Sequence, residues 1–166
     1  MPKNIANILK CLLMLILIHH TAQPAWTANS DLRGAPEQYL NKGRADVEKK
    51  GYSAAVKPLT EAIKLNPDLA EAYFLRARSF EMIGQPMRAL KDVGKYIDLK
   101  PHDPKGYILK GDINNFNQDH KEAVDSYSFA LRLDSRSVDA RIGRGLAYAA
   151  MEKYDLAIKD YEDALK

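Results

Sequence analysis

Residues 70–103 read AEAYFLRARSFEMIGQPMRALKDVGKYIDLKPHD, and the pattern of this stretch recurs along the chain every 34 residues. One alanine keeps that spacing throughout, at Ala55, Ala89, Ala123 and Ala157. A second series of small residues has the same spacing and consists of Gly43, Ala77, Gly111 and Gly145. Small residues in phase at one fixed spacing indicate an internal structural repeat. We expect them to lie where two elements of a repeat come closest.

Each repeat predicts two helices, because apolar residues recur every three to four places within each of its halves. Turn signals separate the halves, for example Gly84-Gln85-Pro86 inside the quoted stretch and Asn66-Pro67-Asp68 before it. The first helices are predicted at 36–49, 70–83, 104–117 and 138–151. The second helices are predicted at 52–65, 86–99, 120–133 and 154–165. The expected fold class is all-α, a solenoid of helix-turn-helix repeats.

The quoted stretch also resembles a known family. It has Tyr73, Ala77 and Phe80 in the first half, followed by Ala89 and Pro101. This is similar to the pattern W-x2-L-G-x2-Y…A-x3-F…P of the tetratricopeptide repeat (TPR) family. The resemblance implies a right-handed superhelix of about four repeats. Their limits are repeat 1 at 36–69, repeat 2 at 70–103, repeat 3 at 104–137 and repeat 4, truncated and without a capping helix, at 138–166.

Two departures from the family pattern affect packing. A position that is usually apolar holds a basic residue in every repeat, namely Lys42, Arg76, Lys110 and Arg144. We interpret these side chains as stems that cover apolar surface while their charges reach water. Asp46 and Asn114 replace the expected aromatic residue, which predicts weaker packing of the first helices in repeats 1 and 3.

Residues 1–30 differ from the rest of the chain. MPKNIANILK carries two lysines, CLLMLILI is uninterrupted apolar sequence, and a polar tail rich in small residues follows. This order is typical of a secretory signal peptide, with Ala28-Asn29-Ser30 as the preferred cleavage point. Eight apolar residues span only about 12 Å as a helix, well short of a ~30 Å bilayer core. We predict a signal at 1–30, a linker at 31–35 and export to the periplasm or medium; an uncleaved membrane anchor is the alternative.

Charge and cysteine content exclude several classes of function. The net charge is +3, and it falls to +1 without residues 1–30, which contain Lys3, Lys10 and no acidic residue. A nucleic-acid partner is therefore not expected. The single cysteine, Cys11, lies in the apolar stretch, so residues 31–166 can form neither disulfides nor thiolate metal sites.

A cluster of Asp98, His102, Asp103 and Asp112 is the strongest candidate for chemistry. It contains only one histidine, and it spans the junction between repeats 2 and 3. Asp103 before Pro104 has the form of a helix N-cap followed by proline at the first helical position. We therefore interpret the cluster as turn and cap residues, and predict no catalytic residue, metal or cofactor and no enzymatic activity.

The TPR resemblance implies a concave groove, lined by the first helices, that holds a peptide or a partner's helix. It assigns to this groove Leu40, Arg44, Phe74, Arg78, Met82, Ile108, Asp112, Phe116 and Ile142. Phe74, Met82 and Phe116 are the expected apolar anchors, and Arg44 and Arg78 would hold an acidic group. The lysine position with which some TPR chaperone adaptors grip a terminal carboxylate holds Leu40, Phe74 and Ile108, so that binding mode is not expected.

The predicted function is an exported scaffold or adaptor that binds a protein partner through this groove. The alternatives are a membrane-tethered assembly factor and a helical-repeat protein that binds nucleic acid. Near the end of repeat 4, Ile158, Tyr161 and Leu165 predict an apolar surface. Self-association and a docked partner are the two alternatives for that surface.

Overall fold

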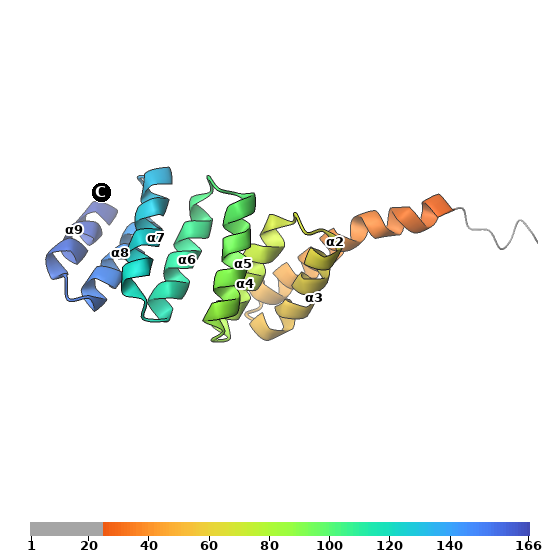
Figure 1. Ribbon diagram of the computed structural model, residues 1–166, viewed down its shortest axis with the longest axis horizontal. Helices are drawn as coiled ribbons and strands as arrows, with labels where there is room; N and C mark the ends of the chain where they lie inside the picture. The colour runs from red at the N-terminus through yellow and green to blue at the C-terminus, as the bar shows by residue number, and fades with distance from the viewer. Residues whose placement is uncertain (1–24) are drawn as a thin grey trace, which may run out of the picture. The chain divides into compact units, whose positions relative to one another are not determined.

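The computed structural model describes the backbone of residues 25–166 and the side chains from Gly34 onward. Within that range all the regular secondary structure is helical, which confirms the predicted all-α fold class (Figure 1). The helices are α2 (Ala25–Glu48), α3 (Tyr52–Leu65), α4 (Ala70–Met82), α5 (Pro86–Leu99), α6 (Pro104–Phe116), α7 (His120–Leu133), α8 (Val138–Ala150) and α9 (Tyr154–Ala164). Apart from the start of α2, every end agrees with its predicted position to within one residue.

The first helix begins earlier than predicted. Residues 31–35 were expected to form a short linker ahead of the first repeat. In the structure α2 starts at Ala25 and continues through Pro36, so these residues are helical. Proline is disfavoured inside a helix because it lacks an N–H and its ring crowds the preceding turn, but helices that contain a proline do occur. Of the predicted signal peptide, residues 1–24 lie outside the described residues and 25–30 belong to α2.

None of the described helices combines the length and the apolar character needed to cross a bilayer. Residues Pro36–Lys166 form one compact body.

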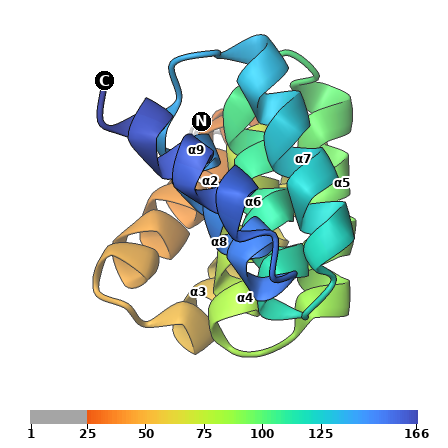
Figure 2. The ribbon, with the colours of Figure 1, turned by 90° about the vertical axis from the view of Figure 1, so that its left-hand side faces the viewer.

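Within this body the helices pack as antiparallel pairs in a row (Figure 1). The first helices of successive repeats contact each other, α4 with α6 and α6 with α8. Among the described helices, no such contact joins α5 to α7, which are second helices. Figure 2, viewed along the row, shows α5 and α7 on the same side. The first helices therefore form the more closely spaced inner layer, and the second helices form the outer layer.

Small residues on the inner helices let large residues on the outer helices pack against the backbone. A Cβ atom added to Gly43 would lie 2.5 Å from Leu59, and one added to Gly145 would lie 2.6 Å from the Tyr161 ring. A Cβ atom added to Gly111 would lie 2.6 Å from the Tyr127 ring. These distances are too short for any side chain. They confirm that the small positions mark the closest approach within repeats 1, 3 and 4.

The turn inside each repeat uses one residue in the left-handed conformation. These residues and their φ angles are Lys50 (59°), Gly84 (73°), Gln118 (67°) and Glu152 (59°). The residue after each turn donates its N–H to a carbonyl five residues earlier, as Gln85 does to Phe80 at 2.8 Å. This bond is that of a Schellman motif, which satisfies carbonyls at the end of a helix. The same closure in every repeat explains why the turns fall in phase.

The cap predicted at Asp103 is present. Asp103 accepts a hydrogen bond from the backbone N–H of Lys105 at 2.9 Å, and Pro104 occupies the first turn of α6. Its second carboxylate oxygen accepts a hydrogen bond from the Tyr96 hydroxyl at 2.6 Å. Ser137 caps α8 in the same way, through the N–H of Ala140 at 3.3 Å. Asp103 is therefore fully used by the joint between repeats 2 and 3.

Candidate partner-binding groove

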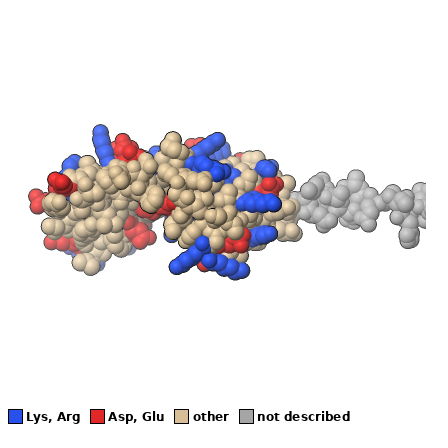
Figure 3. Space-filling view, turned by 90° about the horizontal axis from the view of Figure 1, so that it is seen from below, with Lys and Arg blue, Asp and Glu red and all other residues tan. Residues whose placement is uncertain are grey.

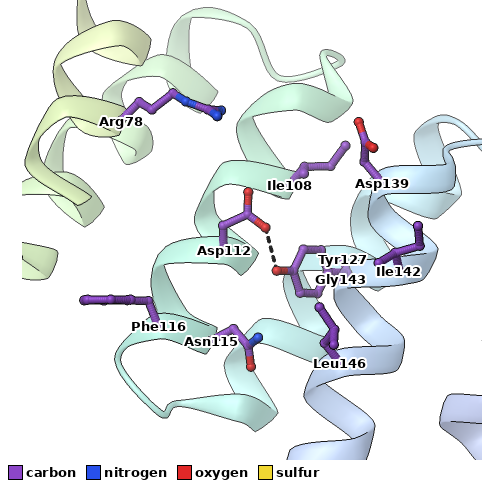
Figure 4. Close-up of a pocket in the computed structure, with 10 residues that line it drawn as sticks. All are labelled: Arg78, Ile108, Asp112, Asn115, Phe116, Tyr127, Asp139, Ile142, Gly143 and Leu146. Carbon is purple, nitrogen blue, oxygen red and sulfur yellow. Dashed lines mark hydrogen bonds between the residues drawn. The ribbon is translucent and has the colours of Figure 1, made fainter. Parts of the chain in front are cut away.

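The inner helices α4, α6 and α8 line a hollow of about 600 Å³, which we call the inner groove (Figure 4). It is open to solvent along the inner layer of the row. Its main lining residues are Arg78, Ile108, Asp112, Phe116, Ile142 and Leu146.

Tyr127 reaches this groove from the outer helix α7. Its ring passes over Gly111 and Gly143, where an added Cβ would lie 2.6 and 2.5 Å from the ring. Only 1% of Tyr127 is exposed, and its hydroxyl donates a hydrogen bond to Asp112 Oδ1 at 2.7 Å (Figure 4). The two glycines thus allow one tyrosine to join α6, α7 and α8 and to fix a carboxylate in the groove.

Acidic groups in and beside the groove have perturbed ionisation. Burial raises the pKa of Asp112, while the Tyr127 hydrogen bond and the Arg78 charge partly oppose that rise. Burial, followed by the nearby charge of Asp112, raises the pKa of Glu81 on α4 to about 7, and Arg78 opposes this. The pKa of Tyr127 is also raised, first by burial and then by Asp112. Asp112 in the groove and Glu81 beside it therefore both favour a nearby positive charge.

Apolar side chains surround these carboxylates and remain accessible. Phe116 is 63% exposed, Leu146 51% and Ile142 42%, and Ile108 is half-buried beside them. Large exposed apolar side chains gathered in a concave site are typical of a binding surface. The arrangement offers apolar contact and negative charge within one hollow.

The structure brings five of the residues predicted for the groove into this one hollow. They are Arg78, Ile108, Asp112, Phe116 and Ile142. Leu146, Asp139 and Asn115 line it as well, although they were not assigned to the site. Met82 is 53% exposed but does not line this hollow.

Three predicted residues have structural contacts instead. Leu40 is only 2% exposed and packs with Leu59 and Ala72, so its assignment to the groove is wrong. Phe74 is half-buried, with its ring centroid 5.0 Å from that of Tyr96. Arg44 forms an ion pair with Glu71 at 2.8 Å, so its guanidinium is already engaged by a carboxylate of the chain itself.

The charges of the four basic residues Lys42, Arg76, Lys110 and Arg144 were predicted to reach water. For Arg76 and Arg144 this prediction is wrong. Arg76 donates two hydrogen bonds to Asp92, at 2.7 and 2.8 Å, and a third to Thr60 at 3.0 Å. Asp92 is only 4% exposed, so this ion pair is buried. Lys42 and Lys110 are exposed, as expected.

Repeat 4 contains the same arrangement. Arg144 donates to Asp160 at 2.8 and 2.6 Å and to Ser128 at 3.1 Å. This hydrogen bonding raises the pKa of Arg144. The signal in the sequence was an Arg-x15-Asp spacing at the same place in repeats 2 and 4. It was missed because the partner lies on the other helix of the repeat.

Residues 25–166 contain no group of three or more His, Cys, Asp or Glu side chains that could hold a metal ion. On the face seen in Figure 3, basic side chains lie mainly over the half of the row nearer the N-terminus. Acidic side chains are more frequent toward the other half.

An all-α solenoid of helix pairs with a groove along its inner helices defines the class of this protein. The chain belongs to the tetratricopeptide repeat family. Two sequence models described as tetratricopeptide repeat match residues 59–91 and 116–166, together just over half of the chain.

Known proteins and structures agree with this assignment. Hsp70-Hsp90 organizing protein 3 of Arabidopsis thaliana is 36% identical over 101 residues, which are 61% of this chain and 18% of that protein. The chain thus spans less than a fifth of the length of that relative. The TPR domain of Arabidopsis OM64 has 28% identity and a TM-score of 0.68, over 71% of this chain and 98% of that domain. MamA of Desulfovibrio magneticus RS-1 shares the fold at 19% identity, with a TM-score of 0.74 over 78% and 73% of the two chains.

Proposed function

We propose that this protein is a scaffold or adaptor that binds a segment of a partner protein in the inner groove. The observation that carries the proposal is the position of Phe116, Ile142 and Leu146, exposed side by side with Asp112 in one concave site. Exposed anchors of this kind supply most of the affinity at protein interfaces. We expect the bound segment to present apolar side chains and one basic side chain, the latter near Asp112 and Glu81.

The relatives support a role in protein binding. The name of the Arabidopsis relative describes a protein that organizes Hsp70 and Hsp90. In the present chain the position that carries a gripping lysine in some chaperone adaptors holds Phe74 and Ile108, which cannot pair with a terminal carboxylate. We therefore propose a partner other than a chaperone tail.

The test is the affinity of a peptide selected from a random display library on the full chain. The variant Phe116→Ala/Ile142→Ala should weaken binding of that peptide by about 30-fold or more, because exposed anchors at interfaces contribute ~1–2 kcal/mol or more each. Fluorescence anisotropy measures the affinity, and circular dichroism checks that helicity is kept. Met87→Ala on the outer helix α5 is the matched control, since Met87 is 75% exposed and lies outside the groove. Equal affinities of the wild type and the double variant would contradict the proposal.

The acidic groups of the groove predict a dependence of stability on pH. The pKa of Glu81 is raised to about 7 in the folded protein, against an ordinary value of 4.5. The folded state therefore binds more protons than the unfolded state between these values, and the stability due to Glu81 falls as the pH rises from 4.5 to 7. Glu81→Gln should gain stability relative to the wild type between pH 5 and pH 8. Urea denaturation of both proteins at the two pH values measures this, and a constant difference would contradict it.

Export remains part of the proposal. The order of positive, apolar and small polar segments in residues 1–30 supports a secretory signal, and a membrane-tethered form is the alternative. The intact mass of the protein isolated from its native compartment distinguishes the two, because cleavage near Ser30 removes the apolar stretch.

A further inference from the structure

A second hollow lies between the outer helices α5 and α7, on a different face of α6 from the inner groove. Figure 2 shows α5 and α7 together on the outer side of α6. We call this hollow, of about 580 Å³, the outer slot; it shares no lining residue with the inner groove. Its main lining residues are Gly94, Lys110, Asn114, Glu122, Asp125 and Phe129.

The neighbouring repeats show what normally occupies this place. At the position of Asn114, repeat 2 has Phe80, which is 3% exposed, and repeat 4 has Tyr148. In both repeats an arginine guanidinium lies over the aromatic ring, Arg76 at 5.8 Å and Arg144 at 5.9 Å from its centroid. Repeat 3 has the shorter Asn114 instead, so the space of an aromatic ring is left open beneath the outer helices.

Repeat 3 also lacks the hydrogen-bonded side chains that lie over the aromatic ring in repeat 2. The Arg76–Asp92–Thr60 arrangement of repeat 2 corresponds to Lys110, Ser126 and Gly94. Lys110 is exposed, and a Cβ atom added to Gly94 would meet nothing within 4 Å. A hollow also lies between α3 and α5, but its lining includes Arg76 and Asp92 and does not reach Phe80. In repeat 3 the hollow extends down to Asn114.

The Asn114 side chain supplies a polar group inside the slot. Asn114 is only 4% exposed, and its carboxamide forms no hydrogen bond with any other described residue. Every fully enclosed side-chain nitrogen or oxygen atom among the described residues has a hydrogen-bond partner. The amide atoms of Asn114 have none, so they are not fully enclosed and reach the open space of the slot. A side chain that is almost wholly buried is normally hydrogen-bonded, so this amide is available for a ligand.

The walls of the slot are aromatic and its mouth is acidic. Tyr107 and Phe129 stack with ring centroids 4.2 Å apart and form one wall. Glu122 and Asp125 are exposed at the mouth, and within residues 34–166 neither forms an ion pair. Aromatic pairs favour a further ring at their face or edge, and exposed carboxylates favour a cation.

We propose that the outer slot binds a tyrosine or tryptophan side chain of a partner polypeptide. The ring occupies the place that Phe80 and Tyr148 fill in the neighbouring repeats. Its hydroxyl or indole N–H bonds to the Asn114 carboxamide. A basic residue adjacent to it in the partner pairs with Glu122 or Asp125. This site lies outside the inner groove, so the protein has two separate surfaces for partners.

The experiment uses ¹⁵N-labelled full chain and three small probes, N-acetyl-tryptophanamide, N-acetyl-tyrosinamide and N-acetyl-leucinamide. The aromatic probes should give saturable shifts at the backbone amides of Lys110, Asn114 and Ser126, with a dissociation constant of about 1–10 mM for ligands of this size. The leucine probe should bind at least fivefold more weakly. Shifts that do not saturate, or that are equally strong with the leucine probe, would overturn the proposal.

Two variants fill the slot by independent routes. Asn114→Phe restores the ring of repeats 2 and 4, and Gly94→Leu places a side chain in open space from the opposite wall. Each should weaken the aromatic probes at least tenfold, and Gly94→Leu provides the test if Asn114→Phe does not fold. Phe116→Ala in the inner groove is the matched control and should leave the affinity unchanged. Aromatic binding that survives Gly94→Leu, or that is lost in Phe116→Ala, would place the ligand elsewhere and overturn the assignment.

Discussion

Asp92→Ala should lower the free energy of unfolding by about 3–5 kcal/mol, one of the largest effects expected for a single substitution in this chain. Asp92 accepts two hydrogen bonds from Arg76, whose side chain is only 16% exposed. Removing the carboxylate leaves a guanidinium largely buried with Thr60 as its remaining polar partner. A buried charge without a counter-ion costs far more than the intact pair contributes. Urea denaturation followed by circular dichroism measures the loss.

The double variant Arg76→Met/Asp92→Leu distinguishes the cost of an unpaired buried charge from the contribution of the intact ion pair to the free energy of unfolding. It removes both charges and keeps much of the buried volume, so it should lie within about 1–2 kcal/mol of the wild type. Asp98→Ala on the same helix is the control and should change stability by less than about 0.5 kcal/mol, because Asp98 is exposed. A loss below 1 kcal/mol for Asp92→Ala would show that water reaches the pair in solution.

Repeat 3 provides a natural comparison for this variant. Its corresponding residues are Lys110, which is exposed, and Ser126, which donates its hydroxyl proton to the carbonyl of Glu122 at 2.8 Å. Repeat 1 has Lys42 and Pro58 at these places, so repeats 1 and 3 both already lack the ion pair. The pair is one way of closing the outer surface of a repeat, and in repeat 3, where it is missing, the outer slot is open.

The helix boundaries could be predicted because their signals are local. A left-handed residue such as Gly84 and a cap such as Asp103 act within a few residues of themselves, and each recurs in phase. The pairing of glycines with large side chains could also be predicted, because close packing requires a large side chain opposite a residue as small as Gly111 or Gly145.

The features that were not predicted depend on neighbours in space. Leu40 and Ile142 occupy the same place in their repeats, yet one is 2% and the other 42% exposed. Leu40 is enclosed together with Leu59 and Ala72, which come from the next two helices. The position of a residue within its repeat does not specify which neighbours will enclose it. Arg76 likewise has its partners 16 residues away in either direction, on two different helices. A family pattern predicts on which face of its helix a residue lies. Whether that residue is buried or forms an ion pair depends on the particular residues that face it from neighbouring helices.

Tyr127→Ala should be as damaging as the loss of Asp92, with an expected cost of about 3–5 kcal/mol. The ring is 1% exposed and fills the space above two glycines on two different helices. Its removal leaves a cavity, because Gly111 and Gly143 have no side chain with which to fill it. The substitution also deprives Asp112 of a hydrogen bond of 2.7 Å. Urea denaturation measures the cost, and a loss below 1 kcal/mol would mean that α6, α7 and α8 close over the vacant space.

A double-mutant cycle links this cost to the glycine beneath the ring. Gly111→Leu alone should destabilise the fold by about 1–3 kcal/mol through overpacking, since its side chain enters the space of the Tyr127 ring. Combined with Tyr127→Ala, the leucine fills the cavity, so the double variant should be more stable than the sum of the single effects by at least about 1 kcal/mol. Gly145→Leu is the control partner, because Gly145 packs against Tyr161 instead, and its cost should add to that of Tyr127→Ala. Strict additivity for Gly111 would show that the ring and this glycine are not in contact in solution, and the account of how the groove is built would then be wrong.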